Sequence, residues 1–274
     1  MNKIYNIYQV SDSTGETLDR IFLAIKAQFY NFECKTIHYS FTRTENQIDK
    51  IIQKSKKEEN IIILYTIVDN NLAKYLTTEC NKKKIPNFEV LGSLISDFSK
   101  LLGKNANRKP SGQHVLDDEY YKRIDAVQFT MTHDDGKIIS DLENSDIVLV
   151  GVSRTSKTPT SIYLANRGYK TTNIPLIRNK KMPNALIKKT KKTCVVGLIC
   201  DPSRLSDVRR NRIQAIQEDR PSDYTDEKKI IDEIEESKAL FKKYNWPTID
   251  VTRKSVEETA ASVIKIFDIL NSDE

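Results

Sequence analysis

The chain has 274 residues, of which 38% are hydrophobic and 30% charged, a balance typical of a soluble globular protein with one large or two modest domains. No apolar run approaches the ~18 residues of a transmembrane helix, and the first residues lack the apolar segment of a signal peptide, so we expect a cytoplasmic protein that enters no membrane. The net charge of +6 lies in scattered lysine pairs without interleaved aromatic residues, which argues against nucleic-acid binding. The four cysteines show neither a CxxC pair nor metal-ligand spacing, so we expect no disulfide framework and no zinc site.

The first half of the chain alternates predicted strands with predicted helices. Apolar runs predict strands over residues 3–10, 35–42, 61–68 and 87–91. Helical spacing of apolar residues predicts helices over 45–57, 71–83 and 93–102, and a first helix with a core-facing stripe of Leu18, Ile21, Phe22, Ile25 and Phe29. This alternation is typical of an α/β fold with a mostly parallel sheet.

A turn rich in hydroxyl groups, residues 11–17 (SDSTGET), joins the first strand to the first helix. Ser13 and Glu16 have the spacing of a capping box, in which the hydroxyls would only cap the helix. A Ser/Thr/Gly turn at a helix N-terminus is also a candidate anion site. Both interpretations stay open at this point.

The most loop-like stretch of the chain is 104–112 (KNANRKPSG), which is polar and contains a proline and a glycine. A helix is predicted to follow over 117–132. We therefore place a domain boundary in the interval 105–145. Residues 1–110 are assigned to an N-terminal α/β domain and residues 111–274 to a C-terminal domain.

The C-terminal domain opens with a strand, a turn and a helix. The apolar run 147–150 predicts a strand buried on both faces, and the helix after the turn is expected to end near Gly168. The turn follows the phosphate-binding P-loop pattern G-x-x-x-x-G-K-[ST] at all but one position. In such a loop backbone N–H groups surround phosphate oxygens, the lysine adds charge and the hydroxyl binds Mg²⁺. We therefore predict a nucleotide site, with Lys157 catalytic and Thr158 on the metal, formed by Gly151, Val152, Ser153, Arg154, Thr155, Ser156, Lys157 and Thr158.

The departure from the pattern is Ser156, which stands in the place of the second glycine. Serine lacks the freedom of glycine at positive φ, so it fits this position if its φ is negative or modestly strained. The alternative interpretation is an ordinary strand–turn–helix that carries a surface lysine at position 157.

The remainder of the chain continues the alternation, with strands predicted over 169–175, 194–200 and 247–251 and a helix over 226–244. A helix after Asp201 is expected to carry Arg204, Arg209, Arg210 and Arg212 opposite Leu205, Val208, Ile213 and Ile216. Ser255 and Glu258 have capping-box spacing and begin a closing helix with the apolar face Val256, Ala260, Val263, Ile264, Phe267 and Leu270.

Acidic residues are the candidates for positioning an acceptor or a metal ion. Asp134 and Asp135, in the turn HDDG, are candidates with His114 to orient a target hydroxyl, although acidic residues also favour turns and His133 is typical of the surface. Asp201, at the end of an apolar strand, would either orient a metal ion or cap the next helix. The arginines that follow it would neutralise a polyphosphate or form a solvated face.

Five separated blocks of the sequence resemble the regulatory proteins of pyruvate, phosphate dikinase. These blocks are SDSTGET at 11–17, RIDAVQFTMTHDDG at 123–136, GVSRTSKTP with SIYLANRGYK at 151–170, DPSRLSDVRRNR at 201–212 and WPTIDVTRKSVEETA at 246–260. The resemblance runs nearly end to end. A sister group regulates phosphoenolpyruvate synthetase and usually has SRSGKT or SRCGKT in the loop, whereas SRTSKT looks like the branch directed at the dikinase.

The resemblance, and not composition or spacing, implies a bifunctional enzyme. Family members phosphorylate a threonine near the catalytic histidine of the dikinase with ADP as donor, and reverse this with inorganic phosphate as acceptor, releasing pyrophosphate. It also implies Mg²⁺, a homodimer and the dikinase as protein partner. The alternatives are a P-loop kinase for a small metabolite, a regulator of phosphoenolpyruvate synthetase, and a nucleotide-dependent binding module without chemistry.

Overall fold

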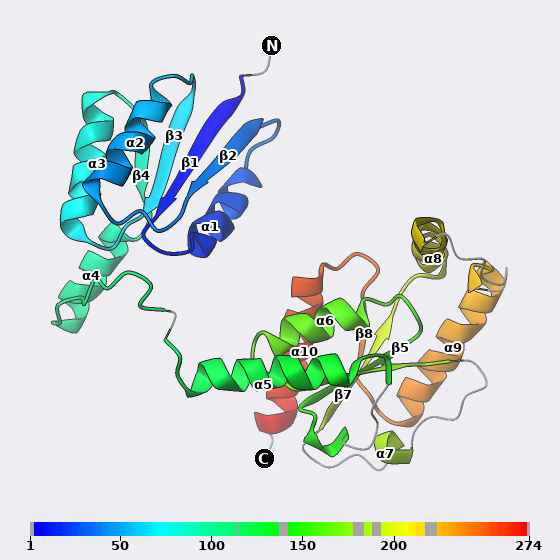
Figure 1. Cartoon of the computed structure of the whole chain (residues 1–274). Helices are drawn as coiled ribbons and strands as arrows, with labels where there is room; N and C mark the ends of the chain where they lie inside the picture. The colour runs from blue at the N-terminus through cyan, green and yellow to red at the C-terminus, as the bar shows by residue number, and fades with distance from the viewer. Residues whose placement is uncertain are drawn as a thin grey trace. The chain divides into compact units, whose positions relative to one another are not determined.

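The computed structural model describes residues 3–113, 115–136, 142–177, 184–187, 193–216 and 224–272. The chain divides into two compact units, residues 1–115 and 116–274, each built around its own four-stranded sheet (Figure 1). All described strand pairings in both sheets are parallel, so the predicted α/β class is confirmed. Among the described helices, none combines the length and apolar character needed to cross a membrane.

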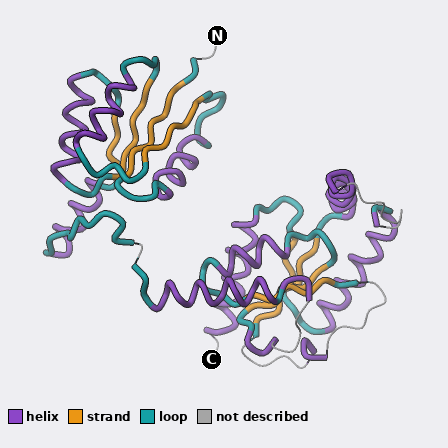
Figure 2. Tube along the Cα trace, viewed as in Figure 1, coloured by secondary structure: helices purple, strands orange, loops and turns teal. Residues whose placement is uncertain are grey.

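The first unit has the strand order β2-β1-β3-β4, with helices on both faces of the sheet (Figure 2). In β1, Tyr8 and Val10 belong to the core formed with α2 and α3, whereas Ile7 packs with Leu18 and Phe22 of α1 on the other face. The elements are β1 (Tyr5–Ser11), α1 (Glu16–Lys26), β2 (Cys34–Tyr39), α2 (Glu45–Ser55), β3 (Ile61–Thr66), α3 (Asn70–Lys82), β4 (Asn87–Glu89) and α4 (Gly92–Leu102).

The turn between β1 and α1 does not contain the predicted capping box. The N-cap of α1 is Gly15, in the left-handed conformation at φ 92°, and no side chain caps the helix. The predicted stripe of α1 is also too long, because the helix ends at Lys26 and Phe29 beyond it is 62% exposed. The hydroxyl groups of residues 11–17 therefore do not cap α1.

The second unit has the strand order β6-β5-β7-β8, which places β5 inside the sheet. One face of β5 packs with Leu164 of α6 and Ala260 of α10, and the other packs with Phe241 of α9. The elements are α5 (Asp118–Thr132), η1 (Asp134–Gly136), η2 (Leu142–Asn144), β5 (Ile147–Gly151), α6 (Lys157–Ala165), β6 (Thr171–Pro175), α7 (Asn184–Ile187), β7 (Cys194–Ile199), α8 (Pro202–Ile216), α9 (Glu227–Lys243), β8 (Thr248–Asp250) and α10 (Val256–Ser272).

The capping box of the closing helix is confirmed. The Ser255 hydroxyl accepts from the Glu258 amide at 3.1 Å, and the Glu258 carboxylate accepts from the Ser255 amide at 2.8 Å. Ala260 and Val263 on its predicted apolar face are buried, but Leu270 is 45% exposed because it lies in the last turn, beyond the edge of the core.

Candidate phosphate-binding site

The predicted phosphate loop, residues 151–158, joins the fully buried strand β5 to helix α6. A side chain at Gly151 would collide with its neighbours, because a Cβ there would meet the Leu198 carbonyl at 2.6 Å and Thr155 Oγ1 at 2.9 Å. The Thr155 hydroxyl instead donates to the Val152 carbonyl at 3.0 Å and closes the turn. The first residue of the pattern is therefore a glycine for a steric reason.

Two non-glycine residues of the loop take the left-handed conformation, Arg154 at φ 73° and Ser156 at φ 57°. Ser156 is the N-cap of α6, and no side chain accepts from the first turn of this helix. Of the two conformations expected for this serine, negative φ is not found. Ser156 thus adopts the left-handed backbone conformation that glycine, the usual residue at this position of a P-loop, adopts more easily. Because no side chain caps α6, the N–H groups at its start are free to face an anion.

Lys157 is almost enclosed by the loop, with 5% of its surface exposed, and is not the surface lysine of the alternative interpretation. Its Nζ donates to the Val152 carbonyl at 2.8 Å. Burial lowers the pKa of this amine to about 8, although the nearby Asp135 carboxylate favours the charged form, and the Arg209 charge lowers the pKa further. A buried amine beside arginine and without a direct carboxylate partner among its described contacts favours an anionic ligand.

The Thr158 hydroxyl lies in a polar cluster with Asp134 and Asn173. It donates to Asp134 Oδ1 at 2.9 Å, and Asn173 Nδ2 donates to the same carboxylate oxygen and to the Thr158 hydroxyl, the latter at 2.9 Å. Asn173 is 1% exposed, and its Oδ1 has no described hydrogen-bond partner. The turn HDDG thus reaches the phosphate loop through Asp134.

The second acid of the turn, Asp135, is exposed and adopts φ 54°. His133 is not the surface residue that the sequence suggested: it is 4% exposed and stacks on Phe129 with ring centroids 3.8 Å apart. Its Nδ1 lies 2.7 Å from the Phe129 carbonyl, and its own carbonyl accepts from the Asn173 amide at 3.3 Å. His133 therefore anchors the acidic turn to β6. His114 lies outside the described residues.

Arg209 of α8 supports the loop from its other side. It is 1% exposed and donates to the Ser153 carbonyl at 3.3 Å, to the Tyr224 carbonyl at 3.2 Å and to Glu233 Oε2 at 2.7 Å. The prediction that this arginine lies opposite Leu205 is wrong, because both residues are buried on the same face of the helix. Their spacing of four residues was the signal for this shared face.

Tyr224 also contacts the loop and has no counterpart in the sequence-based site. Its hydroxyl lies 3.2 Å from Ser153 Oγ and accepts from Arg154 Nε at 3.4 Å, and its ring lies 4.8 Å from the Arg209 guanidinium carbon. Burial acts to raise the pKa of this hydroxyl, but the Ser153 and Arg154 hydrogen bonds and the two arginine charges outweigh burial and lower it. Arg154, Arg209 and Tyr224 thus surround Ser153.

Asp201 lies at the start of α8. Its Oδ1 accepts from the Arg204 amide at 3.0 Å, and its amide donates to Thr252 Oγ1 at 2.8 Å. These contacts are those of a helix N-cap. The described contacts of Asp201 therefore connect it to α8 and to the segment after β8, and only indirectly to the loop.

Comparison with known proteins gives matches along nearly the whole chain. The model of the kinase/pyrophosphorylase family matches residues 7–264. A protein of Pelagibacter ubique named "Putative pyruvate, phosphate dikinase regulatory protein" is 60% identical over 269 residues, which cover 98% of each chain. Proteins of the same name from Chelativorans sp. and Rhizobium meliloti are 45% and 44% identical, with 96% of each chain covered. The chain therefore belongs to the kinase/pyrophosphorylase family and is a phosphotransferase.

Proposed function

We propose that this protein regulates a pyruvate, phosphate dikinase by reversible phosphorylation of a threonine. In the forward reaction the threonine Oγ forms a bond to the terminal phosphorus of ADP, the bond between that phosphorus and the bridging oxygen breaks, and AMP leaves. The hydroxyl proton passes to a base or to water. In the reverse reaction an oxygen of inorganic phosphate attacks the phosphothreonine phosphorus, the threonine oxygen leaves with a proton, and pyrophosphate is released.

The observation that carries the proposal is the enclosed amine of Lys157 at the start of α6. Phosphoryl transfer requires that phosphates be held and their charge neutralised, and it asks little covalent work of the protein. Lys157 and the N–H groups of the loop supply these functions for the terminal phosphate of a nucleotide. The relatives that carry the regulatory name are similar over the whole chain, which supports the dikinase as the target.

The oxygen cluster beside the loop fits a magnesium ion. Mg²⁺ prefers oxygen ligands and is usually held by one or two carboxylates together with substrate phosphates. Thr158 and Asp134 would hold it, and Asn173 Oδ1, which is buried without a described partner, is a further donor there. When bound, the ion would neutralise charge on the phosphates.

Asp135 is the candidate to orient the threonine hydroxyl in this proposal. Its carboxylate is exposed, it belongs to the same turn as Asp134, and its charge acts on Lys157. Because Asp134 already accepts a hydrogen bond from the Thr158 hydroxyl, we assign Asp134 to the metal ion and Asp135 to the acceptor threonine. Asp201 enters as a positioning residue, because it caps the helix from which Arg209 reaches the loop.

The test is the phosphorylation state of purified dikinase after incubation with ADP labelled in its terminal phosphate, with and without this protein. We expect label on one threonine, and its release as pyrophosphate when inorganic phosphate is added. Phosphoenolpyruvate synthetase and a panel of metabolites, assayed in parallel, separate the alternative substrates. Absence of label from both the dikinase and the synthetase would contradict the proposal.

Sedimentation measurements test whether the protein is the homodimer that the resemblance implies. Cell fractionation tests whether it lies in the cytoplasm, as the sequence predicts.

A further inference from the structure

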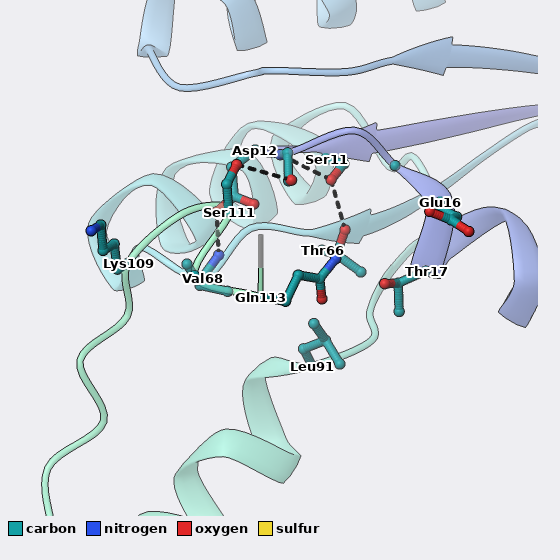
Figure 3. A pocket seen from close by; sticks show the side chains of 13 residues that line it. Ser11, Asp12, Glu16, Thr17, Thr66, Val68, Leu91, Lys109, Ser111 and Gln113 are labelled. Carbon is teal, nitrogen blue, oxygen red and sulfur yellow. Dashed lines mark hydrogen bonds between the residues drawn. The ribbon is translucent and has the colours of Figure 1, made fainter. Parts of the chain in front are cut away.

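A pocket lies in the first unit, where β1 and β3 end (Figure 3). It measures about 150 Å³ and is lined by the β1–α1 turn, by Thr66 and Val68 at the end of β3, by Leu91, and by the segment 109–113. In the order β2-β1-β3-β4 the chain passes from β1 to β2 on one side and then crosses to β3 on the other, so the carboxyl ends of β1 and β3 form a topological switch point, where open parallel sheets bind ligands. Pockets for drug-sized molecules measure about 300–1,000 Å³, so this one suits a smaller ligand.

Two serine hydroxyls in this pocket accept hydrogen bonds while their own protons have no described acceptor. Arg43 Nη2 donates to Ser111 Oγ at 3.0 Å, and Ser111 Oγ donates to Ser13 Oγ at 3.0 Å. On the other side, Thr66 Oγ1 donates to Ser11 Oγ at 3.1 Å. Ser11 and Ser13 are 3% and 8% exposed, so bulk water does not readily satisfy their O–H groups. A ligand that lacks donors and offers acceptors would satisfy both.

Backbone donors point to the same conclusion. The first described hydrogen bond within α1 runs from the Asp19 amide to the Gly15 carbonyl at 3.0 Å. The amides of residues 16–18 precede it, and no side chain caps this end of the helix. Gly15, Glu16 and Thr17 all line the pocket, so the positive end of the α1 dipole borders it.

Charged groups of both signs lie at the pocket. Lys109 lines it, and Arg43 Nε donates to the Asp12 carbonyl at 2.8 Å. Two acids also line it, Asp12 and Glu16. The Asp12 carboxylate is already engaged, since its Oδ2 accepts from the Val68 amide at 2.7 Å, and burial raises its pKa. Lys109, two hydroxyls and the helix amides therefore border the pocket together with the engaged Asp12 carboxylate and Glu16, and Arg43 lies behind the lining, bonded to Ser111 and to the Asp12 carbonyl.

We propose that this pocket binds a phosphate group, either as inorganic phosphate or as a small phosphate monoester, separately from the loop 151–158. A tetrahedral oxyanion brings several acceptor oxygens into a small volume, which matches donors that converge from the β1–α1 turn and from Lys109. The inference goes beyond the proposed function and does not depend on the phosphoryl donor or on the target.

The NMR signals of glycine amides can report on this pocket and on the loop 151–158 separately. The chain has eight glycines, of which Gly15 and Gly112 line this pocket and Gly151 belongs to the loop. In protein labelled with ¹⁵N-glycine, we expect inorganic phosphate to shift the Gly15 and Gly112 amide signals in a saturable way, and sodium chloride at equal ionic strength to leave them unchanged. A parallel titration with O-phosphothreonine shows whether the free anion or the ester binds more tightly.

The proposal is overturned if Gly15 stays unmoved at phosphate concentrations that would saturate a site with a dissociation constant of ~1 mM, or if only Gly151 moves. Ser13→Ala and Lys109→Ala should each weaken binding about 10-fold or more, the effect of losing one hydrogen bond to a charged group. Lys104→Ala, at an exposed lysine outside the pocket lining, is the control. Lys109 is exposed, so Lys109→Ala should fold even if Ser13→Ala does not. Unchanged phosphate affinity in Lys109→Ala would contradict the proposed phosphate site. When ADP is added to the same sample, a shift of the Gly151 amide signal tests the proposed function independently.

Discussion

The carboxylate of Asp134 accepts a hydrogen bond of 2.9 Å from the hydroxyl of Thr158, 24 residues further along the chain. This contact joins an acidic turn at the end of α5 to the first turn of α6. It also assigns different surroundings to the two neighbouring acids of the turn, because Asp134 is held by the loop and Asp135 is exposed. The chemistry proposed for the site depends on this division.

Asp134→Asn and Asp135→Asn should therefore have different effects. Asp135→Asn is expected to lower turnover at saturating ADP by about 10²-fold or more, the usual contribution of a positioned acid or base, with ADP affinity retained. Asp134→Asn is expected to weaken binding of ADP with Mg²⁺ instead. Calorimetric titration and single-turnover assays of both variants separate the two effects, and equal losses of affinity in the two would place Asp135 on the nucleotide side.

Lys157→Met should lower the rate of transfer by about 10²–10³-fold while the second unit remains folded. Methionine fills most of the space of the buried stem but cannot contact phosphate, and a single such partner is typically worth about 10²–10³-fold in rate. The measurement is label transfer to the dikinase, with circular dichroism as the check on folding. Near-normal transfer by a folded variant would rule out the loop as the phosphate site.

The lowered pKa of Lys157 predicts proton uptake on ADP binding. The amine has a pKa of about 8 in the folded protein and an ordinary value of 10.5, and phosphate binding favours its charged form. Calorimetry between pH 8 and 10.5 in two buffers of different ionisation enthalpy should therefore detect uptake, which Lys157→Met should lack. In the same window the unfolded state binds more protons, so this residue adds to stability as pH rises. ADP binding without proton uptake would mean that the amine does not meet the phosphates.

Ser156→Gly should stabilise the protein by up to ~1 kcal/mol and retain ADP binding, because glycine adopts φ 57° without the cost that a side chain brings. Ser156→Val should damage stability and affinity, since a β-branched residue is strongly disfavoured in this conformation. The same change within a helix, Ser262→Gly in α10, is the control and should destabilise by about 0.5 kcal/mol. Thermal unfolding and ADP titration measure both quantities; a valine variant with unchanged affinity would mean that position 156 does not face the ligand.

Arg209→Lys should weaken ADP binding and destabilise the second unit by about 1–3 kcal/mol. Lysine keeps the charge but cannot bond at once to the Ser153 carbonyl, the Tyr224 carbonyl and Glu233. The neighbouring change Arg210→Lys is a matched control, because Arg210 is exposed and its ion pair with Asp207 lies at the surface. Similar effects of the two substitutions would remove Arg209 from the loop's support.

The sequence predicted the elements of the fold well because strands such as β5 and β7 are uninterrupted apolar runs, and a strand buried on both faces has few alternatives. The strand and helix around the loop 151–158 were also predictable from consecutive residues, whereas phosphate binding by the loop stays a prediction. Contacts between distant segments were not predictable. Nothing local in HDDG indicates that Asp134 meets Thr158. Arg209 was assigned to the polar face because arginine is rarely buried, although its spacing of four residues from Leu205 indicates a shared face.

The turn SDSTGET shows the same limit in another way. The spacing of Ser13 and Glu16 matches a capping box, but the left-handed Gly15 turns the chain between them. The hydroxyls are then held by Ser111 and Thr66, which lie 98 and 55 residues away from their partners. Local spacing could not distinguish helix capping from this long-range network.

The packing of α10 against α6 has a consequence for how the protein acquires its chemistry during synthesis. Val263 and Ala260 of α10 share a core with Leu164 of α6, the helix that begins at Lys157. Among the described elements α10 is the last to leave the ribosome. The first unit can fold while the second is still being translated, but the loop has no firm backing until α10 has emerged. We therefore expect the loop to reach its final geometry only after α10 has packed against α6.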